Sequence, residues 1–150
     1  MPMPFSLTSA GRSGLFSLLT LGVCCMMDPA LAQGSGAVTL DAMQTALKSH
    51  SAVVFDIREP QEHAAGVAAG THLLPMSQIG QRMNEIPKDQ PVLLICNTQN
   101  RSSRVAEALR QRGWTQVQYV NGGMSTWAQR GLPMVKPAEN KPSAIRAAKP

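Results

Sequence analysis

Short, unbroken apolar runs alternate with amphipathic stretches through the middle of the chain. Two runs, residues 52–57 and 91–95, are apolar at nearly every position and are bounded by polar residues or proline. A continuous apolar run of this length is typical of a strand buried on both faces of a parallel sheet. Weaker patterns predict short strands at residues 72–75 and 116–120, and an edge strand at Val38.

Apolar residues at helical spacing predict helices between these strands. The predicted helices cover residues 40–48, capped by Thr39, and residues 78–85, 102–112 and 124–130, with a brief helix beginning at Pro60. Strands that alternate with helices predict an α/β fold with a central, mostly parallel sheet and helices on both faces. In such a sheet, side chains that follow the carboxyl ends of the strands meet at one edge.

The first 32 residues have the pattern of a secretory signal peptide. Arg12 precedes an uncharged, mainly apolar run over residues 15–27, and Ala30-Leu31-Ala32 follows it. This pattern predicts cleavage after Ala32 and export, with the periplasm as the expected compartment. The run is shorter than the roughly 18 residues of a membrane span, so no stable span is expected after cleavage. An uncleaved anchor is the alternative.

The remainder divides into three parts. Residues 33–37 are predicted to be a flexible lead-in, residues 38–135 a single folded domain, and residues 136–150 a disordered basic tail rich in Lys, Pro and Ala. A chain of 150 residues with 43% hydrophobic content supports one such domain. The formal charge of +5 is spread along the chain and only 4% of residues are aromatic, which disfavours nucleic-acid binding. A basic surface fits small anionic substrates better.

Only one cysteine, Cys96, lies in the predicted domain, because Cys24 and Cys25 belong to the leader. A disulfide framework and a zinc site of several thiolates are therefore excluded there. The three histidines lack metal-ligand spacing and are predicted to be surface or turn residues: His50, His63 and His72. We expect neither a metal nor a cofactor.

Cys96 stands where the apolar run 91–95 ends and a polar loop opens the next helix. Unpaired N–H groups of the loop and of the first helical turn, together with the helix dipole, favour a thiolate at this position. Asp56 and Arg58 follow the neighbouring strand in the same way, so we expect a shared site. The alternative is a buried structural cysteine.

Four segments, in order and spacing, resemble the rhodanese (sulfurtransferase) family. They are residues 56–62, then Gly70 with Leu74-Pro75, then Cys96–Ser102, and finally Gly122–Met124 with Trp127 and Gly131–Pro133. Together they span about residues 38–135. The resemblance implies a single-domain rhodanese-like α/β fold, in agreement with the pattern of strands and helices.

The resemblance also implies that Cys96 is a nucleophile that takes a sulfane sulfur from a donor such as thiosulfate. The resulting persulfide would pass its sulfur to a thiophilic acceptor, such as cyanide, a small thiol or a thiol-bearing protein. The implied active-site loop consists of Asn97, Thr98, Gln99, Asn100, Arg101 and Ser102, with Arg58 beside it and Asp56 in a structural role. Alternatively, Arg58 forms a structural salt bridge with Asp56, Glu59 or Glu62, and Ser102 caps the helix rather than contacting substrate.

Three positions depart from the family pattern. Gln99 stands where the family often has glycine, and Asn97 stands where many thiosulfate-using members carry a basic residue. Gly66-Val67-Ala68 replaces the usual Gly-His-Ile. The first two changes predict poorer turnover of thiosulfate without loss of the nucleophile.

Three other functions compete with a sulfurtransferase enzyme. A persulfide carrier would hand sulfur to a partner protein and turn over small donors poorly. A phosphatase or arsenate reductase is disfavoured, because four residues separate Cys96 from Arg101 and phosphate-binding relatives use one more. A non-catalytic interaction module is disfavoured by the presence of both Cys96 and Arg101.

Overall fold

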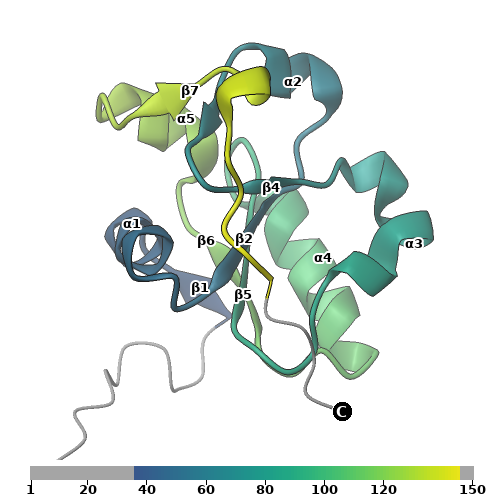
Figure 1. Ribbon diagram of the computed structural model, residues 1–150. Helices are drawn as coiled ribbons and strands as arrows, with labels where there is room; N and C mark the ends of the chain where they lie inside the picture. The colour runs from purple at the N-terminus through teal and green to yellow at the C-terminus, as the bar shows by residue number, and fades with distance from the viewer. Residues whose placement is uncertain (1–35, 146–150) are drawn as a thin grey trace, which may run out of the picture.

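A five-stranded parallel sheet lies at the centre of the computed structural model, which describes residues 36–145 (Figure 1). The strands across the sheet are, in order, β1 (Ala37–Val38), β6 (Val117–Val120), β5 (Val92–Ile95), β2 (Val53–Asp56) and β4 (His72–Leu73). Each strand is parallel to its neighbours. The predicted α/β fold is therefore confirmed. β1 begins inside the segment that was predicted to be a flexible lead-in.

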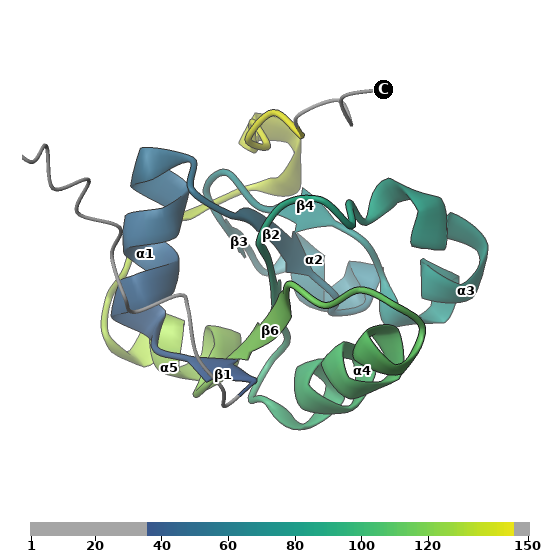
Figure 2. The same cartoon turned by 90° about the horizontal axis from the view of Figure 1, so that it is seen from below.

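Helices cover both faces of the sheet (Figure 2). α1 (Leu40–Ser49) and α5 (Gly123–Gln129) pack on one face, and α3 (Ile79–Arg82) and α4 (Asn100–Gln111) pack on the other. Thr39 caps α1 as predicted, since its hydroxyl accepts a hydrogen bond from the N–H of Ala42 at 3.1 Å. The short helix α2 (Pro60–Ala64) follows β2.

The single helix predicted over residues 78–85 is wrong. The segment instead forms the 3-10 turn η2 (Met76–Gln78), the short helix α3 and the 3-10 turn η3 (Met83–Glu85). Gly80 and Asn84 are weak helix formers, so three short turns replace one continuous helix.

The alternation of side chains along β5 determines on which face of the sheet the side chain of Cys96 lies. Val92 and Leu94 belong to the apolar cluster beneath α4, whereas Leu93 and Ile95 belong to the cluster beneath α1 and α5. Cys96 continues the row of Val92 and Leu94 and belongs to the same cluster. Its side chain therefore lies between the sheet and α4.

A second, two-stranded sheet was not predicted. β3 (Val67–Ala68) pairs antiparallel with β7 (Met134–Val135), although residues 64–70 have the composition of a loop. Two residues are too few to show the period-2 alternation that identifies a strand. This small sheet joins the segment after α2 to the segment after α5.

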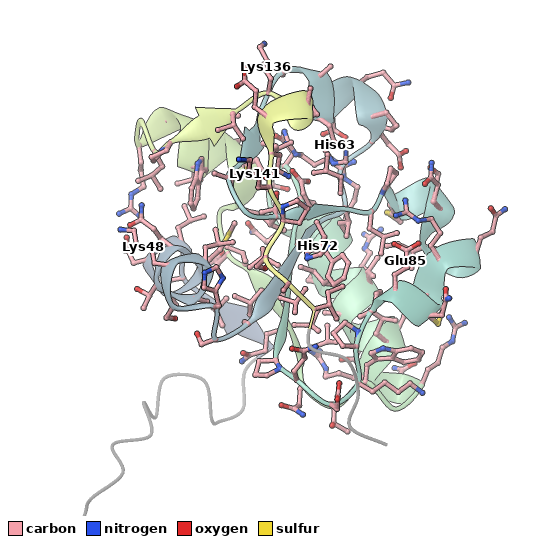
Figure 3. The ribbon with its side chains drawn as sticks, viewed as in Figure 1. Lys48, His63, His72, Glu85, Lys136 and Lys141 are labelled. Carbon is pink, nitrogen blue, oxygen red and sulfur yellow. The ribbon has the colours of Figure 1, made fainter. Side chains whose placement is uncertain are left out.

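The predicted disorder of the C-terminal tail is wrong for residues 136–145. The turn η4 (Pro137–Glu139) leads into a segment that lies against β4. Asn140 accepts a hydrogen bond from the N–H of Gly70 and donates one to the carbonyl of Thr71, at 2.9 and 2.7 Å. Nε2 of His72 lies 2.7 Å from the carbonyl oxygen of Ser143, beside the C-terminal segment in Figure 3. The tail is ordered because these polar groups cover an open sheet edge, a contact that composition does not reveal.

The predicted signal peptide, residues 1–32, and the last residues of the tail, 146–150, lie outside the described residues. Within residues 36–145, no helix is long and apolar enough to cross a membrane.

Candidate active site

Cys96 directly follows the last residue of β5, at the carboxyl edge of the sheet. The residue is buried, with 1% of its surface exposed. The loop that follows it is polar and open to solvent, since Asn97, Thr98 and Asn100 are exposed. The sulfur therefore lies at the base of an exposed loop, with the apolar cluster behind it.

Ser102 makes both polar contacts that are seen at the sulfur. Its backbone N–H donates to Sγ of Cys96 at 3.4 Å, and the thiol donates to its Oγ at 3.4 Å. The hydroxyl of Ser102 in turn donates to the carbonyl of Gln99 at 3.2 Å. Ser102 lies in the first turn of α4, where backbone N–H groups have no partner within the helix. One of these N–H groups is thus used to bind the sulfur.

The interpretation of Ser102 as the cap of the helix is wrong. The capping position belongs to Gln99, whose side chain makes no capping hydrogen bond. The hydroxyl of Ser102 is instead turned back toward Cys96 and the carbonyl of Gln99.

The N-terminus of α5 holds the outer side of the loop. The N–H of Met124 donates to the carbonyl of Cys96 at 2.8 Å, and the N–H of Ser125 donates to the carbonyl of Asn97 at 2.9 Å. In a trans peptide the C=O and N–H bonds point in opposite directions. The amides that follow these carbonyls, those of Asn97 and Thr98, therefore point away from α5.

Gly123 allows this close contact between α5 and the loop. It has a φ of 61°, and a Cβ at this position would overlap the carbonyl oxygens of Thr98 and Cys96. Any other residue would push the loop away from the helix. The turn geometry expected for Gly122-Gly123 is present, and the steric role of Gly123 against the loop is a second function of the pair.

Gln99 does not require the left-handed conformation that glycine would allow. Its φ and ψ are −151° and −7°. Its side-chain oxygen accepts a hydrogen bond from the N–H of Gly122 at 3.2 Å. Glutamine in place of the family's glycine therefore adds a hydrogen bond between the loop and the turn before α5.

Arg101 closes the loop by binding Glu62 of α2 rather than by facing solvent freely. Its two terminal nitrogens donate to the two carboxylate oxygens of Glu62 at 2.7 and 2.6 Å. The bond to Arg101 holds the pKa of Glu62 below its ordinary value, despite partial burial. The same bond raises the pKa of Arg101.

Arg58 is buried within the fold, with 4% of its surface exposed. Its guanidinium donates to both carboxylate oxygens of Asp56 and to the carbonyl oxygens of Glu62 and Gly66. These bonds occupy the head group, so the geometry supports the structural interpretation of Arg58. Asp56, the residue expected to be structural, is its partner.

His63 is buried beside Asp56, so its expected surface position is wrong. Its Nε2 lies 3.4 Å from Oδ1 of Asp56, because α2 turns this side chain back toward the end of β2. Burial alone raises the pKa of Asp56, but His63 and Arg58 outweigh it and hold the pKa of this carboxyl below its ordinary value. Nothing in the spacing of the histidines signalled this contact. Among residues 36–145, no group of three His, Cys, Asp or Glu side chains could hold a metal ion.

Comparison with known proteins identifies the family. The family model of the rhodanese-like domain matches residues 39–130. The chain therefore belongs to the rhodanese-like domain family.

Two relatives have closely similar sequences. The chain is 42% identical over 76 residues to the uncharacterized protein YqhL of Bacillus subtilis, covering 51% of this chain and 60% of YqhL. It is 41% identical over 85 residues to a protein named sulfurtransferase from Allochromatium vinosum, covering 57% of this chain and 79% of the relative.

Solved structures of similar fold include a rhodanese-related protein of Thermoplasma volcanium. It matches with a TM-score of 0.60 and 28% identity, covering 66% of this chain and 96% of that protein. The human single-domain sulfurtransferase TSTD1 matches with a TM-score of 0.58 and 21% identity, over 65% of this chain and 98% of its own. At that identity, the match to TSTD1 shows the fold alone.

Proposed function

We propose that this protein is a sulfurtransferase that carries sulfane sulfur as a persulfide on Cys96. The observation that carries the proposal is the N–H of Ser102 directed at Sγ of Cys96 where β5 gives way to α4. A positively polarised helix terminus and its free amides stabilise a thiolate and the persulfide anion that follows it. Membership of the rhodanese-like domain family and the relative named sulfurtransferase support the same chemistry.

Loading with thiosulfate is a displacement at sulfur. The thiolate of Cys96 attacks the outer sulfur of the donor and forms a new S–S bond. The S–S bond of thiosulfate breaks, and sulfite leaves with the electron pair. No general base is needed once the thiol is ionised, because no proton moves in this step.

Unloading reverses the roles of the two sulfurs. An acceptor such as cyanide attacks the outer sulfur of the Cys96 persulfide and leaves as thiocyanate. The electron pair of the broken S–S bond returns to Cys96 as its thiolate. The outer sulfur stands about 2 Å beyond Sγ.

A persulfide carrier is the second candidate, and a specific observation favours it. Both arginines beside the loop are bound to carboxylates: Arg58 to Asp56 and Arg101 to Glu62. A small dianion therefore has little cationic attraction to hold it, whereas a partner protein can supply its own contacts. Fast removal of the sulfur by a protein thiol, together with slow removal by cyanide, would favour a carrier over a small-molecule enzyme.

A single-turnover experiment tests the proposal. The reduced protein is mixed with excess thiosulfate in the absence of an acceptor, and the released sulfite is measured. A persulfide on Cys96 predicts one sulfite per protein in wild type and none in Cys96→Ser, with the fold of the variant checked by circular dichroism. Equal sulfite release from Cys96→Ser would exclude Cys96 as the acceptor of sulfur.

Export belongs to the same proposal, on the basis of residues 1–32 alone. The apolar run and Ala30-Leu31-Ala32 predict a mature chain that begins at Gln33. The intact mass of the protein recovered from its host tests this, and a species that retains Met1 to Ala32 would contradict it.

A further inference from the structure

The charge around the loop is negative, although the chain as a whole is basic. Five ionisable side chains from the end of β2, the start of α2 and the loop surround it: Asp56, Arg58, Glu59, Glu62 and Arg101. Three are carboxylates and two are guanidinium groups. Ionisation of Cys96 adds a further negative charge. Among these side chains, and with His63 beside Asp56 counted as neutral, negative charge therefore exceeds positive charge.

Arg101 is the cation that could offset this charge, but Glu62 already neutralises it. Glu62 binds it through two short hydrogen bonds from its two terminal nitrogens. Arg58 is buried against Asp56. Neither guanidinium is left to attract a dianion.

Arg104 lies further along α4 but faces elsewhere. It lines a shallow hollow between α4 and β6, together with Glu107, Arg110 and Tyr119. Arg101, by contrast, points to α2. Exposed charges separated by more than about 8 Å are largely screened at physiological salt, so the groups at the loop dominate the field that a donor meets there.

We infer that this site takes sulfane sulfur from alkyl persulfides, which are attacked in their neutral, protonated form, in preference to thiosulfate, and that Glu62 sets this preference by neutralising Arg101. The inference rests on the proposed function and names the class of its donor. Thiosulfate carries two negative charges on the molecule that is attacked, whereas the protonated form of a persulfide with an uncharged alkyl group carries none. Repulsion from the local carboxylates therefore slows the first donor and not the second.

The chemical step with a persulfide is balanced without a further reactant. The thiolate of Cys96 attacks the outer sulfur of R–S–S–H and forms the S–S bond of the Cys96 persulfide. The S–S bond of the donor breaks, and the thiolate R–S⁻ leaves with the electron pair. The proton remains on the transferred sulfur.

The test compares the rates at which two donors load Cys96, measured by mass spectrometry of the Cys96 peptide. The donors are thiosulfate and 2-hydroxyethyl persulfide, whose alkyl group is uncharged. We expect the persulfide to load wild-type Cys96 at least about tenfold faster, and Glu62→Gln to raise the ratio of the thiosulfate rate to the persulfide rate about tenfold. Glutamine suits the capping box at the start of α2 nearly as well as glutamate.

Glu107→Gln is the matched control. Glu107 also binds an arginine, Arg110, but on the far part of α4, so its removal should leave the ratio of the two rates unchanged. A ratio that Glu62→Gln leaves unmoved, or a fall in both rates by the same factor, would overturn the inference, because Glu62 would then act only on the shape of the loop.

The salt dependence of wild type provides a second measurement that needs no variant. Repulsion predicts that loading by thiosulfate accelerates as the ionic strength rises, while loading by the persulfide, whose reacting form is neutral, stays nearly constant. Slower loading by thiosulfate at higher salt would show attraction and overturn the inference. In that case both donors would still load Cys96, and the proposed sulfurtransferase function would stand. If neither donor loads Cys96, the inference and the proposed function are both overturned.

Discussion

At the scale of single residues, Ser102 contributes both an N–H and a hydroxyl to the sulfur of Cys96. In the thiol form the hydroxyl accepts a hydrogen bond from sulfur and donates to the carbonyl of Gln99. A serine hydroxyl can rotate, so it can donate to the sulfur once Cys96 is ionised. Ser102 is therefore expected to stabilise the thiolate and the persulfide.

Ser102→Ala tests this role, because it removes the hydroxyl and keeps the backbone N–H. Loss of one hydrogen bond to a charged group predicts a fall of about tenfold in the rate at which thiosulfate loads Cys96. Ser103→Ala is the control, since the hydroxyl of Ser103 bonds only to the carbonyl of Asn100. Equal rates in Ser102→Ala and Ser103→Ala would show that the hydroxyl of Ser102 has no part in the chemistry.

At the scale of elements, α5 and α2 hold the loop from two sides. α5 binds the carbonyls of Cys96 and Asn97, and Glu62 of α2 binds Arg101 at the start of α4. The loop is thus fixed by contacts to elements that are distant from it in sequence. Its shape depends on the packing of those elements and not on the loop residues alone.

Two glycine variants separate this packing from backbone strain. Gly123 and Gly131 have nearly the same φ, 61° and 64°, but a Cβ meets the loop backbone only at Gly123. We expect Gly131→Ala to lower the free energy of unfolding by about 1 kcal/mol. Gly123→Ala should lower it by about 3 kcal/mol and also slow loading of Cys96, because the loop must move.

Chemical denaturation of both variants measures the difference. Similar losses of stability in the two variants would mean that α5 does not constrain the loop sterically.

The ion pair between Glu62 and Arg101 predicts a dependence of stability on pH. The pKa of Glu62 is lowered in the folded protein by its bond to Arg101, so the pair stabilises the fold above the ordinary pKa of 4.5. This contribution is lost as the pH falls through the lowered pKa. The difference in melting temperature between wild type and Glu62→Gln should therefore shrink as the pH is taken from 7 toward 3. A difference that grows on acidification would contradict the pairing.

The strands and the loop could be predicted from the sequence, whereas the contacts between elements could not. All four residues of β2 and of β5 are buried, so both strands stand out as apolar runs. Cys96 to Ser102 are contiguous, so the loop was predicted as one unit. The positions of Glu62 and His63 depend on how α2 packs against β2 and α4, which no local pattern encodes. β3 and β7 are too short to leave a pattern at all.

At the scale of the whole molecule, the C-terminal segment closes the sheet at β4. Residues 140–143 bind the backbone of Gly70 and Thr71 and the ring of His72, so the domain extends beyond residue 135, where it was predicted to end. These contacts place the C-terminal segment beside the open edge of the sheet.

Asn140→Ala removes the side chain that binds both Gly70 and Thr71. Two lost hydrogen bonds at a half-buried position predict a loss of about 2 kcal/mol in the free energy of unfolding. Asn84→Ala, at an exposed position of η3, is the control and should change stability little. A loss of similar size in both variants would mean that the C-terminal segment does not stabilise the domain.

The most direct measurement of the central claim is the mass of the Cys96 peptide after the protein has met a sulfane sulfur donor. A persulfide mechanism predicts a gain of one sulfur atom on that peptide, removed by a reductant and by an acceptor thiol. A Cys96 peptide that stays unchanged with thiosulfate, alkyl persulfide and polysulfide alike would contradict it, and would leave only the rhodanese-like fold.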